Sequence, residues 1–349
     1  ARVEGWCGQG RRVMAGKPAR GDFAGPLFIT GMWRSGSSLL HALLNKHPQV
    51  KLMYEADLAL LRPVFWKPSA TDWAARWEFW NGAVRRHGFD PAELSEKGTD
   101  FRQAFEGVYH EYARRKGGTI WGDKSPDLYD RMVRLAKIFP EARFIVVWRN
   151  PAAISASMAA AAAKGASFFR KPGMALRGLL GGAMLRRQCD QLLSAGIPLC
   201  EVDYEELVKE PAAVMQRVCE FLGIAYDASL ATLEGANREA IHTGEHHQLL
   251  RGTQIVARTG PAALEAALAA KIERYVRWWQ RKHQNTWPRH PAPAPRVAGA
   301  PGRVERIRDR IQYCAWRSVD AFTRLAFCLA PLSWLRWYRG RKRKEASSS

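Results

Sequence analysis

The chain has 349 residues, 47% of them hydrophobic, and its 54 lysines and arginines against 33 aspartates and glutamates give a formal net charge of +21. This apolar content and the 14 tryptophans exclude an intrinsically disordered chain over most of the length. The excess of positive charge favours an anionic partner. Nucleic acids, anionic membrane surfaces and phosphorylated ligands are the three classes of such partners. Composition does not choose among the three.

The six cysteines lie far apart and form no CxxC pair, which is typical of a reduced, cytoplasmic protein. No run of about 18 apolar residues occurs, so we expect no transmembrane helix. We also expect no metal ion, because the sequence contains neither a carboxylate cluster nor a cysteine–histidine spacing of the metal-binding type.

A strand, a glycine loop and a helix follow one another near the N-terminus. After a basic, glycine-rich and flexible lead-in over residues 1–25, the apolar residues 26–30 predict a short buried strand. Gly36 can adopt the positive φ of a tight turn, and Ser37 begins an apolar pattern with helical spacing. Such a layout directs loop N–H groups and a helix N-terminus towards an anion.

The same loop partly matches the nucleotide P-loop motif. Gly31 and Gly36 have the P-loop spacing, so a P-loop nucleotide-dependent kinase is an alternative. However, Ser37 stands where that motif has its lysine, and the cation of this loop is Arg34.

A second short strand is predicted over residues 50–54, and Glu55 follows its carboxyl end. Ligands of open parallel α/β sheets bind at that edge, so Glu55 is a candidate general base. Capping of a helix by Glu55 or Asp57 is the structural alternative.

Residues 63–116 form an insertion rich in aromatic residues. The spacing of Trp73, Trp77 and Trp80 is that of a helix, and such a pattern is more often part of a core than of a ligand site. We nevertheless expect this insertion on the acceptor side of the protein.

Three further strands are predicted over residues 117–122, 143–148 and 197–202. Lys124 follows the first and Arg149 the second. Because helical patterns separate the strands, we predict an α/β fold, with a central parallel sheet flanked by helices.

The C-terminal part differs in composition. We expect the main domain to cover residues 26–287, followed by a Pro/Ala/Gly linker at 288–302 and a basic amphipathic tail at 303–349. Residues 303–344 contain 12 basic and 3 acidic residues among many aromatic and aliphatic ones. Such a helical extension can lie on an anionic membrane, which would make the protein peripheral, or pack on its own domain.

Taken together, residues 26–225 resemble the sulfotransferases that use 3′-phosphoadenosine-5′-phosphosulfate (PAPS). They are most similar to the tyrosylprotein sulfotransferase-like group and its bacterial relatives. The resemblance rests on four motifs, which are the loop Arg34-Ser35-Gly36-Ser37-Ser38, Glu55 after the second strand, Lys124 in Asp123-Lys124-Ser125-Pro126, and Arg149 followed eight residues later by Ser157.

The resemblance implies a role for each motif. Residues 34–38 would bind the 5′-phosphosulfate of PAPS, while Arg149 and Ser157 would bind its 3′-phosphate. Arg34 and Lys124 would stabilise the transferred sulfuryl group, and Glu55 would be the catalytic base.

The implied partner is an acceptor with a hydroxyl group. A carbohydrate, a glycolipid or another small acceptor is expected, with a peptide tyrosine as the alternative. The sequence contains no zinc-finger, RNA-recognition or helix-turn-helix pattern, so we do not expect a nucleic acid as partner.

Overall fold

The computed structural model describes residues 23–66, 72–96, 98, 100–170, 173–236, 241, 252–256, 266–282 and 300–338. Most of the lead-in, most of the linker and the last eleven residues of the tail therefore lie outside the described residues. At its centre is one five-stranded sheet in the order β2-β3-β1-β4-β5, and every strand pair is parallel. The predicted fold class is confirmed. The strands are β1 (Leu27–Gly31), β2 (Met53–Tyr54), β3 (Gly122–Lys124), β4 (Arg143–Trp148) and β5 (Leu199–Asp203).

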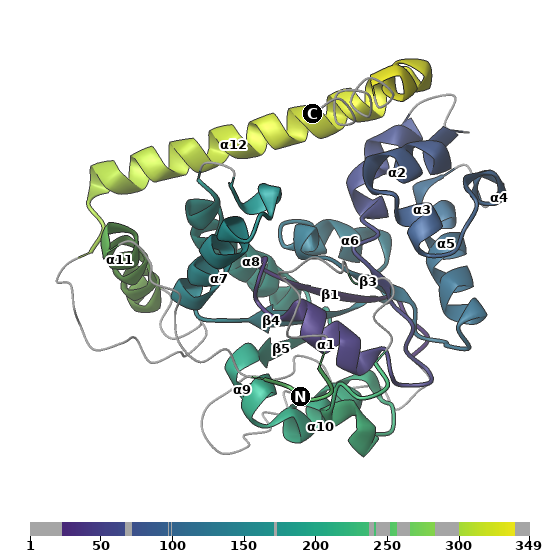
Figure 1. Ribbon diagram of the computed structural model, residues 1–349, viewed down its shortest axis with the longest axis horizontal. Coiled ribbons are helices and arrows are strands. Elements are labelled where there is room, and N and C mark those ends of the chain that lie inside the picture. Colours follow the sequence, from purple (N-terminus) through teal and green to yellow (C-terminus); the bar gives the residue numbers. More distant parts are fainter. Residues whose placement is uncertain are drawn as a thin grey trace.

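Helices cover both faces of this sheet (Figure 1). The helices up to residue 138 are α1 (Ser37–Leu44), η1 (Leu58–Trp66), α2 (Trp73–Asn81), α3 (Ala83–Arg86), α4 (Pro91–Ser95), α5 (Phe101–Arg115), η3 (Pro126–Leu128) and α6 (Met132–Ile138). Those after it are α7 (Pro151–Ala163), η4 (Ser167–Arg170), α8 (Met174–Ser194), α9 (Tyr204–Lys209), α10 (Pro211–Leu222), η5 (Ala228–Ala231), α11 (Ala266–Lys282) and α12 (Arg303–Leu329).

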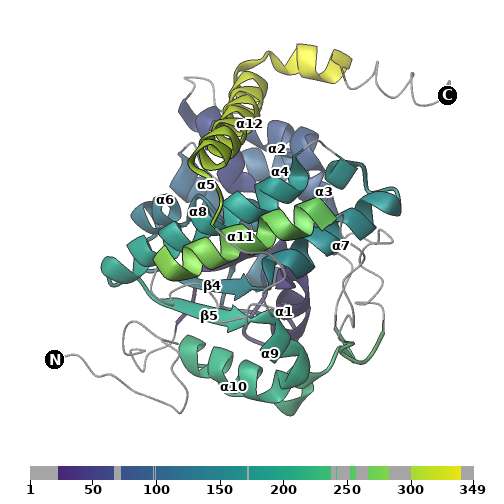
Figure 2. The same ribbon diagram turned by 90° about the vertical axis from the view of Figure 1, so that its left-hand side faces the viewer.

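The two faces of the sheet pack into two separate apolar clusters. Side chains alternate between the faces of a strand, so Leu27 and Ile29 of β1 pack with α1 and α10, whereas Phe28 packs with α5, α6 and α8. Figure 2 shows α10 on one side of the sheet and α8 on the other. All five strands are almost completely buried, as expected for a parallel sheet covered on both sides.

The third strand begins where the sequence predicts its end. Residues 117–122 were expected as the strand, but β3 runs from Gly122 to Lys124 and pairs with β1 on one side and β2 on the other. Gly122 has a φ of 147°, and a Cβ atom there would lie 1.9 Å from the carbonyl oxygen of Leu27. Only a glycine allows the two strands to approach this closely. Lys124 is therefore inside the sheet rather than after it.

The aromatic insertion packs into the main core. Trp73 stacks on Trp77 with a centroid distance of 6.2 Å, and Trp77 stacks on Tyr109 at 6.3 Å. The indole N–H of Trp77 donates a hydrogen bond of 2.6 Å to the carbonyl oxygen of Ala56. Both tryptophans are buried, so their spacing indeed marks a core, and this core supports the loop after β2.

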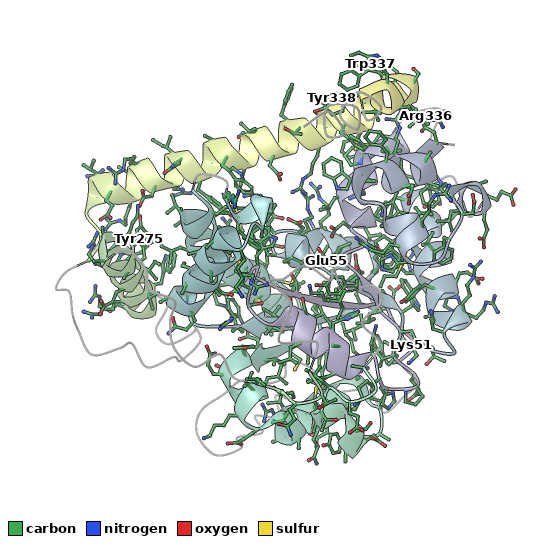
Figure 3. All side chains as sticks on the ribbon, viewed as in Figure 1. Lys51, Glu55, Tyr275, Arg336, Trp337 and Tyr338 are labelled. Carbon is green, nitrogen blue, oxygen red and sulfur yellow. The ribbon has the colours of Figure 1, made fainter. Side chains whose placement is uncertain are left out.

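The C-terminal helices lie on the domain itself. The side chain of Tyr275 on α11, labelled in Figure 3, donates a hydrogen bond of 2.9 Å to Asp309 of α12. Helix α12 then crosses the molecule over η1 and α8 (Figure 1). Among the described residues, no helix is both long and apolar enough to cross a membrane.

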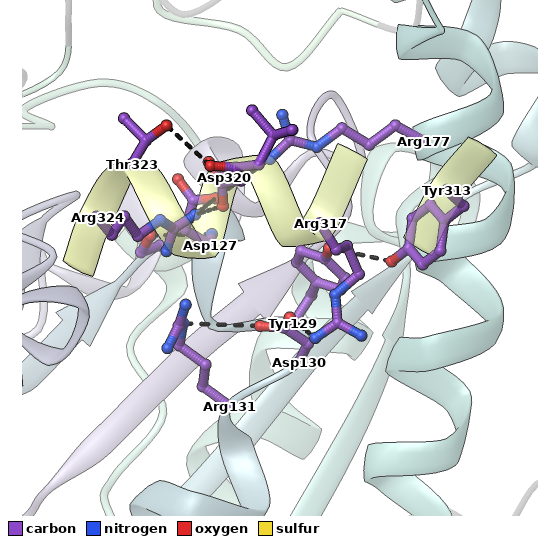
Figure 4. Close-up of polar contacts among 12 residues, drawn as sticks. Asp127, Tyr129, Asp130, Arg131, Arg177, Tyr313, Arg317, Asp320, Thr323 and Arg324 are labelled. Atoms are coloured by element: carbon purple, nitrogen blue, oxygen red, sulfur yellow. Dashed lines mark hydrogen bonds and ion pairs between the residues drawn. The ribbon is translucent and has the colours of Figure 1, made fainter. Parts of the chain in front are cut away.

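An ionic layer fixes α12 to the segment after β3 (Figure 4). The guanidinium of Arg317 lies 2.6 Å from the carboxylate of Asp130, and that of Arg324 lies 3.9 Å from Asp127. The hydroxyls of Tyr129 and Tyr313 are 3.1 Å apart. Asp130 and Arg324 are mostly buried, and each has a partner of opposite charge in the other segment.

A cation–π contact extends from α12 to the loop after β1. The guanidinium of Arg177 on α8 lies 3.4 Å from the ring centroid of Trp316 and 4.0 Å from that of Trp33. Trp33 directly precedes Arg34. Helix α12 is thus connected by one side chain to the loop that the sequence assigns to the donor.

We expect replacement of Phe327 to destabilise the protein and replacement of Phe322 to leave its stability unchanged. Phe327 packs against Trp80 and Phe79 with centroid distances of 4.7 Å and 5.6 Å, whereas Phe322 on the opposite face of α12 is 71% exposed. Phe327→Ala should lower the free energy of unfolding by about 2 kcal/mol and Phe322→Ala by less than about 0.5 kcal/mol. Thermal melting of the two variants measures the difference, and equal melting temperatures would mean that α12 is not docked.

Candidate functional site

The loop between β1 and α1 has the conformation of an anion-binding turn. Arg34 and Gly36 have φ values of 70° and 101°, and helix α1 begins at Ser37. A Cβ atom on Gly36 would lie 2.2 Å from the ring of Tyr204. Gly36 is therefore required twice, for its backbone angle and for the close contact with Tyr204.

Arg34 connects this loop with Arg149 and Ser157, the fourth motif of the sequence. Its Nε donates a hydrogen bond of 3.0 Å to the hydroxyl of Ser157 on α7. The guanidinium of Arg149 donates a bond of 2.9 Å to the carbonyl oxygen of Arg34 and lies 4.2 Å from the ring centroid of Tyr204. The structure thus brings Arg149 and Ser157 to the loop, as the sequence suggests.

Lys124 joins the loop to the end of β2. Its Nζ lies 2.7 Å from a carboxylate oxygen of Glu55 and donates a hydrogen bond of 3.0 Å to the hydroxyl of Ser38. The Lys124 side chain is 2% exposed, whereas that of Glu55 is 24% exposed. Burial alone would lower the pKa of Lys124, but the charges and hydrogen bonds of Glu55 and Tyr54 together outweigh burial, and the pKa is raised above its usual value. Lys124 is therefore positively charged at neutral pH.

Tyr54 completes the surroundings of this ammonium group. The Nζ of Lys124 lies 4.2 Å from the centroid of the Tyr54 ring, and the Tyr54 hydroxyl lies 2.8 Å from that of Ser38. Figure 3 shows Glu55 near the centre of the molecule. Residues from β2, β3 and α1 meet at this point, which is the carboxyl edge of the sheet.

The backbone around Glu55 is strained and is held by many bonds. Arg34, Glu55 and Asp57 are the three non-glycine residues with positive φ in the described part of the chain, with 48° at Glu55 and 60° at Asp57. The carboxylate of Asp123 accepts the backbone N–H groups of Ala56 and Asp57 at 3.3 Å and 3.0 Å. Such conformations cost of order 1–3 kcal/mol each and are concentrated at functional sites.

Arg86 holds the same segment from the other side. Its guanidinium donates hydrogen bonds to the carbonyl oxygens of Glu55 at 2.8 Å and Tyr54 at 3.2 Å. Arg86 belongs to α3 of the aromatic insertion. The insertion therefore positions the main chain of Glu55, although it provides none of the four motifs.

Three other groups that could accept a proton lie near the loop, namely His41, His47 and Asp57, and all three are enclosed by other groups. His41 is buried in α1, and burial lowers its pKa to about 3, so the imidazole is neutral. Its Nε2 lies 3.1 Å from the carbonyl oxygen of Leu52. His47 contacts the carbonyl of Ala225 at 3.0 Å. Burial, followed by the charges of Asp127 and Asp123, raises the pKa of Asp57 well above its usual value. Glu55 is the carboxylate that contacts Lys124.

Several residues of this site are missed by the sequence motifs. Tyr54 directly precedes Glu55, so its position next to a motif residue was the available signal. Asp123 lies within the motif of Lys124, but no pattern indicates its bonds to the backbone of Ala56 and Asp57. Arg86 and Tyr204 come from distant segments, and no local pattern indicates their contacts. Ser35 is buried, and its hydroxyl has no hydrogen-bond partner among the described residues. In that part of the chain, no group of three or more His, Cys, Asp or Glu side chains is arranged to hold a metal ion.

Curated proteins with similar sequences include three named as protein-tyrosine sulfotransferases. A putative protein-tyrosine sulfotransferase of Caenorhabditis briggsae is 24% identical over 232 residues, which are 66% of this chain and 71% of that protein. Protein-tyrosine sulfotransferase A of Caenorhabditis elegans is 26% identical over 58% of this chain and 50% of its own length. The zebrafish (Danio rerio) protein-tyrosine sulfotransferase 1 is 27% identical over 58% of this chain and 54% of its own length. The chain thus spans about half the length of the last two relatives.

Solved structures with a similar course of the chain include two sulfotransferase domains. That of the Synechococcus PCC 7002 olefin synthase is 19% identical, with a TM-score of 0.45, and the match covers 72% of this chain and 94% of the domain. That of the curacin biosynthetic pathway is 17% identical, with a TM-score of 0.46, and the match covers 83% of this chain and 97% of the domain.

The larger part of the chain matches a protein-family model. The model described as "Sulfotransferase family" matches residues 26–228, a range that contains every motif residue discussed above and more than half of the chain. This protein belongs to the sulfotransferase family.

Proposed function

We propose that this enzyme transfers a sulfuryl group from PAPS to an acceptor hydroxyl by in-line displacement. The observation that supports this most directly is the meeting of four separate motifs at one sheet edge, where Lys124 bridges Glu55 and Ser38 and Arg34 contacts Ser157. The family match supports sulfuryl transfer and does not favour the kinase alternative.

The residues present suit a donor with two anionic ends. The loop Arg34-Ser35-Gly36-Ser37-Ser38 would hold the 5′-phosphosulfate, with a helix N-terminus and the buried Ser35 hydroxyl close by. Arg149 and Ser157 would hold the 3′-phosphate. When bound, PAPS supplies a sulfuryl group that is already linked to a phosphate leaving group. We propose no metal ion in this scheme.

The residues of the chain would contribute charge and a proton acceptor. Arg34 and Lys124 are fixed cations, and positive charge placed in advance stabilises the negative charge that develops on oxygen atoms during such a transfer. Glu55 would take the proton of the acceptor hydroxyl on a carboxylate oxygen, a contribution of about 10²–10⁴-fold in rate. Its partly exposed side chain, in contrast to that of Lys124, can be reached by an acceptor.

Two classes of acceptor have support. The names of the relatives favour a peptide tyrosine. The basic tail favours a carbohydrate or glycolipid hydroxyl near an anionic membrane, and we place the aromatic insertion on the acceptor side because Arg86 reaches Glu55. A cytoplasmic location, peripheral on the membrane, stays a prediction from the cysteine pattern and the tail.

A thermal-shift comparison of nucleotides tests the donor class. We expect 3′-phosphoadenosine 5′-phosphate (PAP), the product of the donor, to raise the melting temperature in a saturable way, because ligand binding to the folded state stabilises it. ATP with Mg²⁺ and duplex DNA should give much smaller shifts. A shift with ATP/Mg²⁺ as large as that with PAP would contradict the proposal.

Nucleotides with and without a 3′-phosphate test the Arg149–Ser157 pair. Ser157→Ala and Arg149→Ala should weaken PAP binding by about tenfold or more, since a contact to a charged group contributes roughly 1.5–3 kcal/mol. Binding of adenosine 5′-phosphosulfate, which lacks the 3′-phosphate, should change less. Ser155→Ala on the same helix is the matched control. Because both residues also contact Arg34, equal losses for the two nucleotides would mean that they only support the loop.

Glu55→Gln tests the catalytic base, because it keeps the shape of the side chain and removes the proton acceptor. We expect kcat to fall about 100-fold or more, with PAP affinity within about twofold of the unmodified protein. Asp57→Asn is the comparison, and its effect on kcat should be smaller. A larger loss in Asp57→Asn than in Glu55→Gln would transfer the role of base to Asp57.

A further inference from the structure

The outward face of α12 is an apolar stripe. All but two of the exposed large apolar side chains in the described residues belong to positions 304–338. On the 27-residue helix, which is about 40 Å long, they are spaced by three or four residues within the stretches 304–311 and 319–329, and the two stretches share one side of the helix. We call this side the outer stripe; its members are Val304, Ile307, Ile311, Val319, Phe322, Leu325 and Leu329.

The stripe is not the face that docks α12 on the domain. Docking uses Asp309, Tyr313, Arg324 and Cys328, which are buried on the opposite side of the helix. Ile311 and Phe322, in contrast, are 63% and 71% exposed. An apolar surface of this length is unusual on a soluble protein and marks a binding surface.

The acidic residues of α12 are all paired with cations, whereas its exposed charged residues are all basic. All three acidic residues have a cation of the domain or of the helix itself beside them: Glu305 lies 3.0 Å from Arg274, Asp309 lies 2.6 Å from Lys271, and Asp320 is bonded to Arg324. The exposed charged residues of α12 and of the helical turn after it are arginines, namely Arg303, Arg308, Arg310 and Arg336.

The same bias continues beyond α12. Figure 3 shows Arg336, Trp337 and Tyr338 at the far end of the α12 rod, and both rings are exposed. The sequence then adds Arg339, Arg341, Lys342, Arg343 and Lys344. Apolar and aromatic side chains bordered only by cations are suited to the boundary between anionic headgroups and acyl chains.

We propose that the outer stripe of α12 binds the surface of an anionic lipid bilayer while the inner face of the helix stays docked on the domain. A second copy of the chain fits the stripe less well, since each copy has a net charge of +21 and pairing would bring the exposed arginines together. An anionic bilayer satisfies both the apolar stripe and its cationic border.

Such binding would also orient the catalytic edge. Helix α12 contacts η1 and lies beside Asp127 in η3, which are the segments that follow Glu55 and Lys124 in the chain. The carboxyl edge of the sheet would then face the side of the bilayer, and acceptors carried by the membrane would be favoured. Only this consequence depends on the function proposed above.

Co-sedimentation of the full chain with lipid vesicles tests the proposal. We expect binding to phosphatidylcholine–phosphatidylserine vesicles, weaker binding to phosphatidylcholine alone, and a loss of binding when salt is raised. Ile311→Glu/Phe322→Glu should weaken binding about tenfold or more, since it withdraws two apolar groups and places negative charge against anionic lipid. Ala212→Glu/Ala213→Glu makes the same change of charge at exposed positions of α10, at the opposite end of the molecule in Figures 1 and 2, and should bind within about twofold of the unmodified protein.

Three results would overturn the proposal. The first is that the protein binds neither kind of vesicle. The second is that the stripe and control variants weaken vesicle binding equally. The third is that the unmodified protein forms a dimer in sedimentation velocity and the stripe variant is a monomer. Unchanged melting temperatures show that the variants are folded, and Ile307→Gln/Leu325→Gln serves as a milder second stripe variant. Vesicle binding requires no nucleotide and the PAP shift requires no lipid, so the two proposals can fail independently.

Discussion

A single buried positive charge, the ammonium of Lys124, determines much of the architecture of this site. Removing a charge from water is costly by several kcal/mol unless an opposite charge and hydrogen-bond partners replace the solvent. Here Glu55, Ser38 and the ring of Tyr54 replace it. These groups come from the end of β2 and from α1, so the charge is tolerated only if three segments keep their relative positions.

The strain near this charge has a related origin. Glu55 must leave β2 at once and turn its side chain back to Lys124, and its φ of 48° is the consequence. The main chain is kept there by Arg86 on one side and Asp123 on the other. A buried aromatic core beneath this loop, through the bond from Trp77 to Ala56, gives these contacts a rigid support. Stability of the aromatic insertion and geometry of the site are therefore linked.

The sequence predicts most of the sheet and the meeting of the motifs, because both follow from local rules. Residues 143–148 form an almost purely apolar strand, and polar residues at the ends of parallel strands must share one edge. The start of β3 was misplaced because Gly122 is needed by a contact with Leu27, which no local pattern shows. Similarly, Phe322 and Phe327 are both apolar residues of the amphipathic tail, and the fold packs Phe327 against the core but leaves Phe322 exposed. Periodicity reveals that apolar faces exist, and tertiary packing decides which of them docks.

The ionic layer between α12 and the segment after β3 also constrains how this protein can change during evolution. Asp130 and Arg317 are 187 residues apart in the chain, yet each provides the countercharge of the other, as Arg324 does for Asp127. A lineage that lost α12 would leave both aspartates with fewer cations in a desolvated place, and neutral residues would be selected there. A lineage that neutralised the aspartates would release the helix. The two segments are therefore inherited as a pair, and the C-terminal helix is not a module that can be gained or lost without compensating changes next to Lys124.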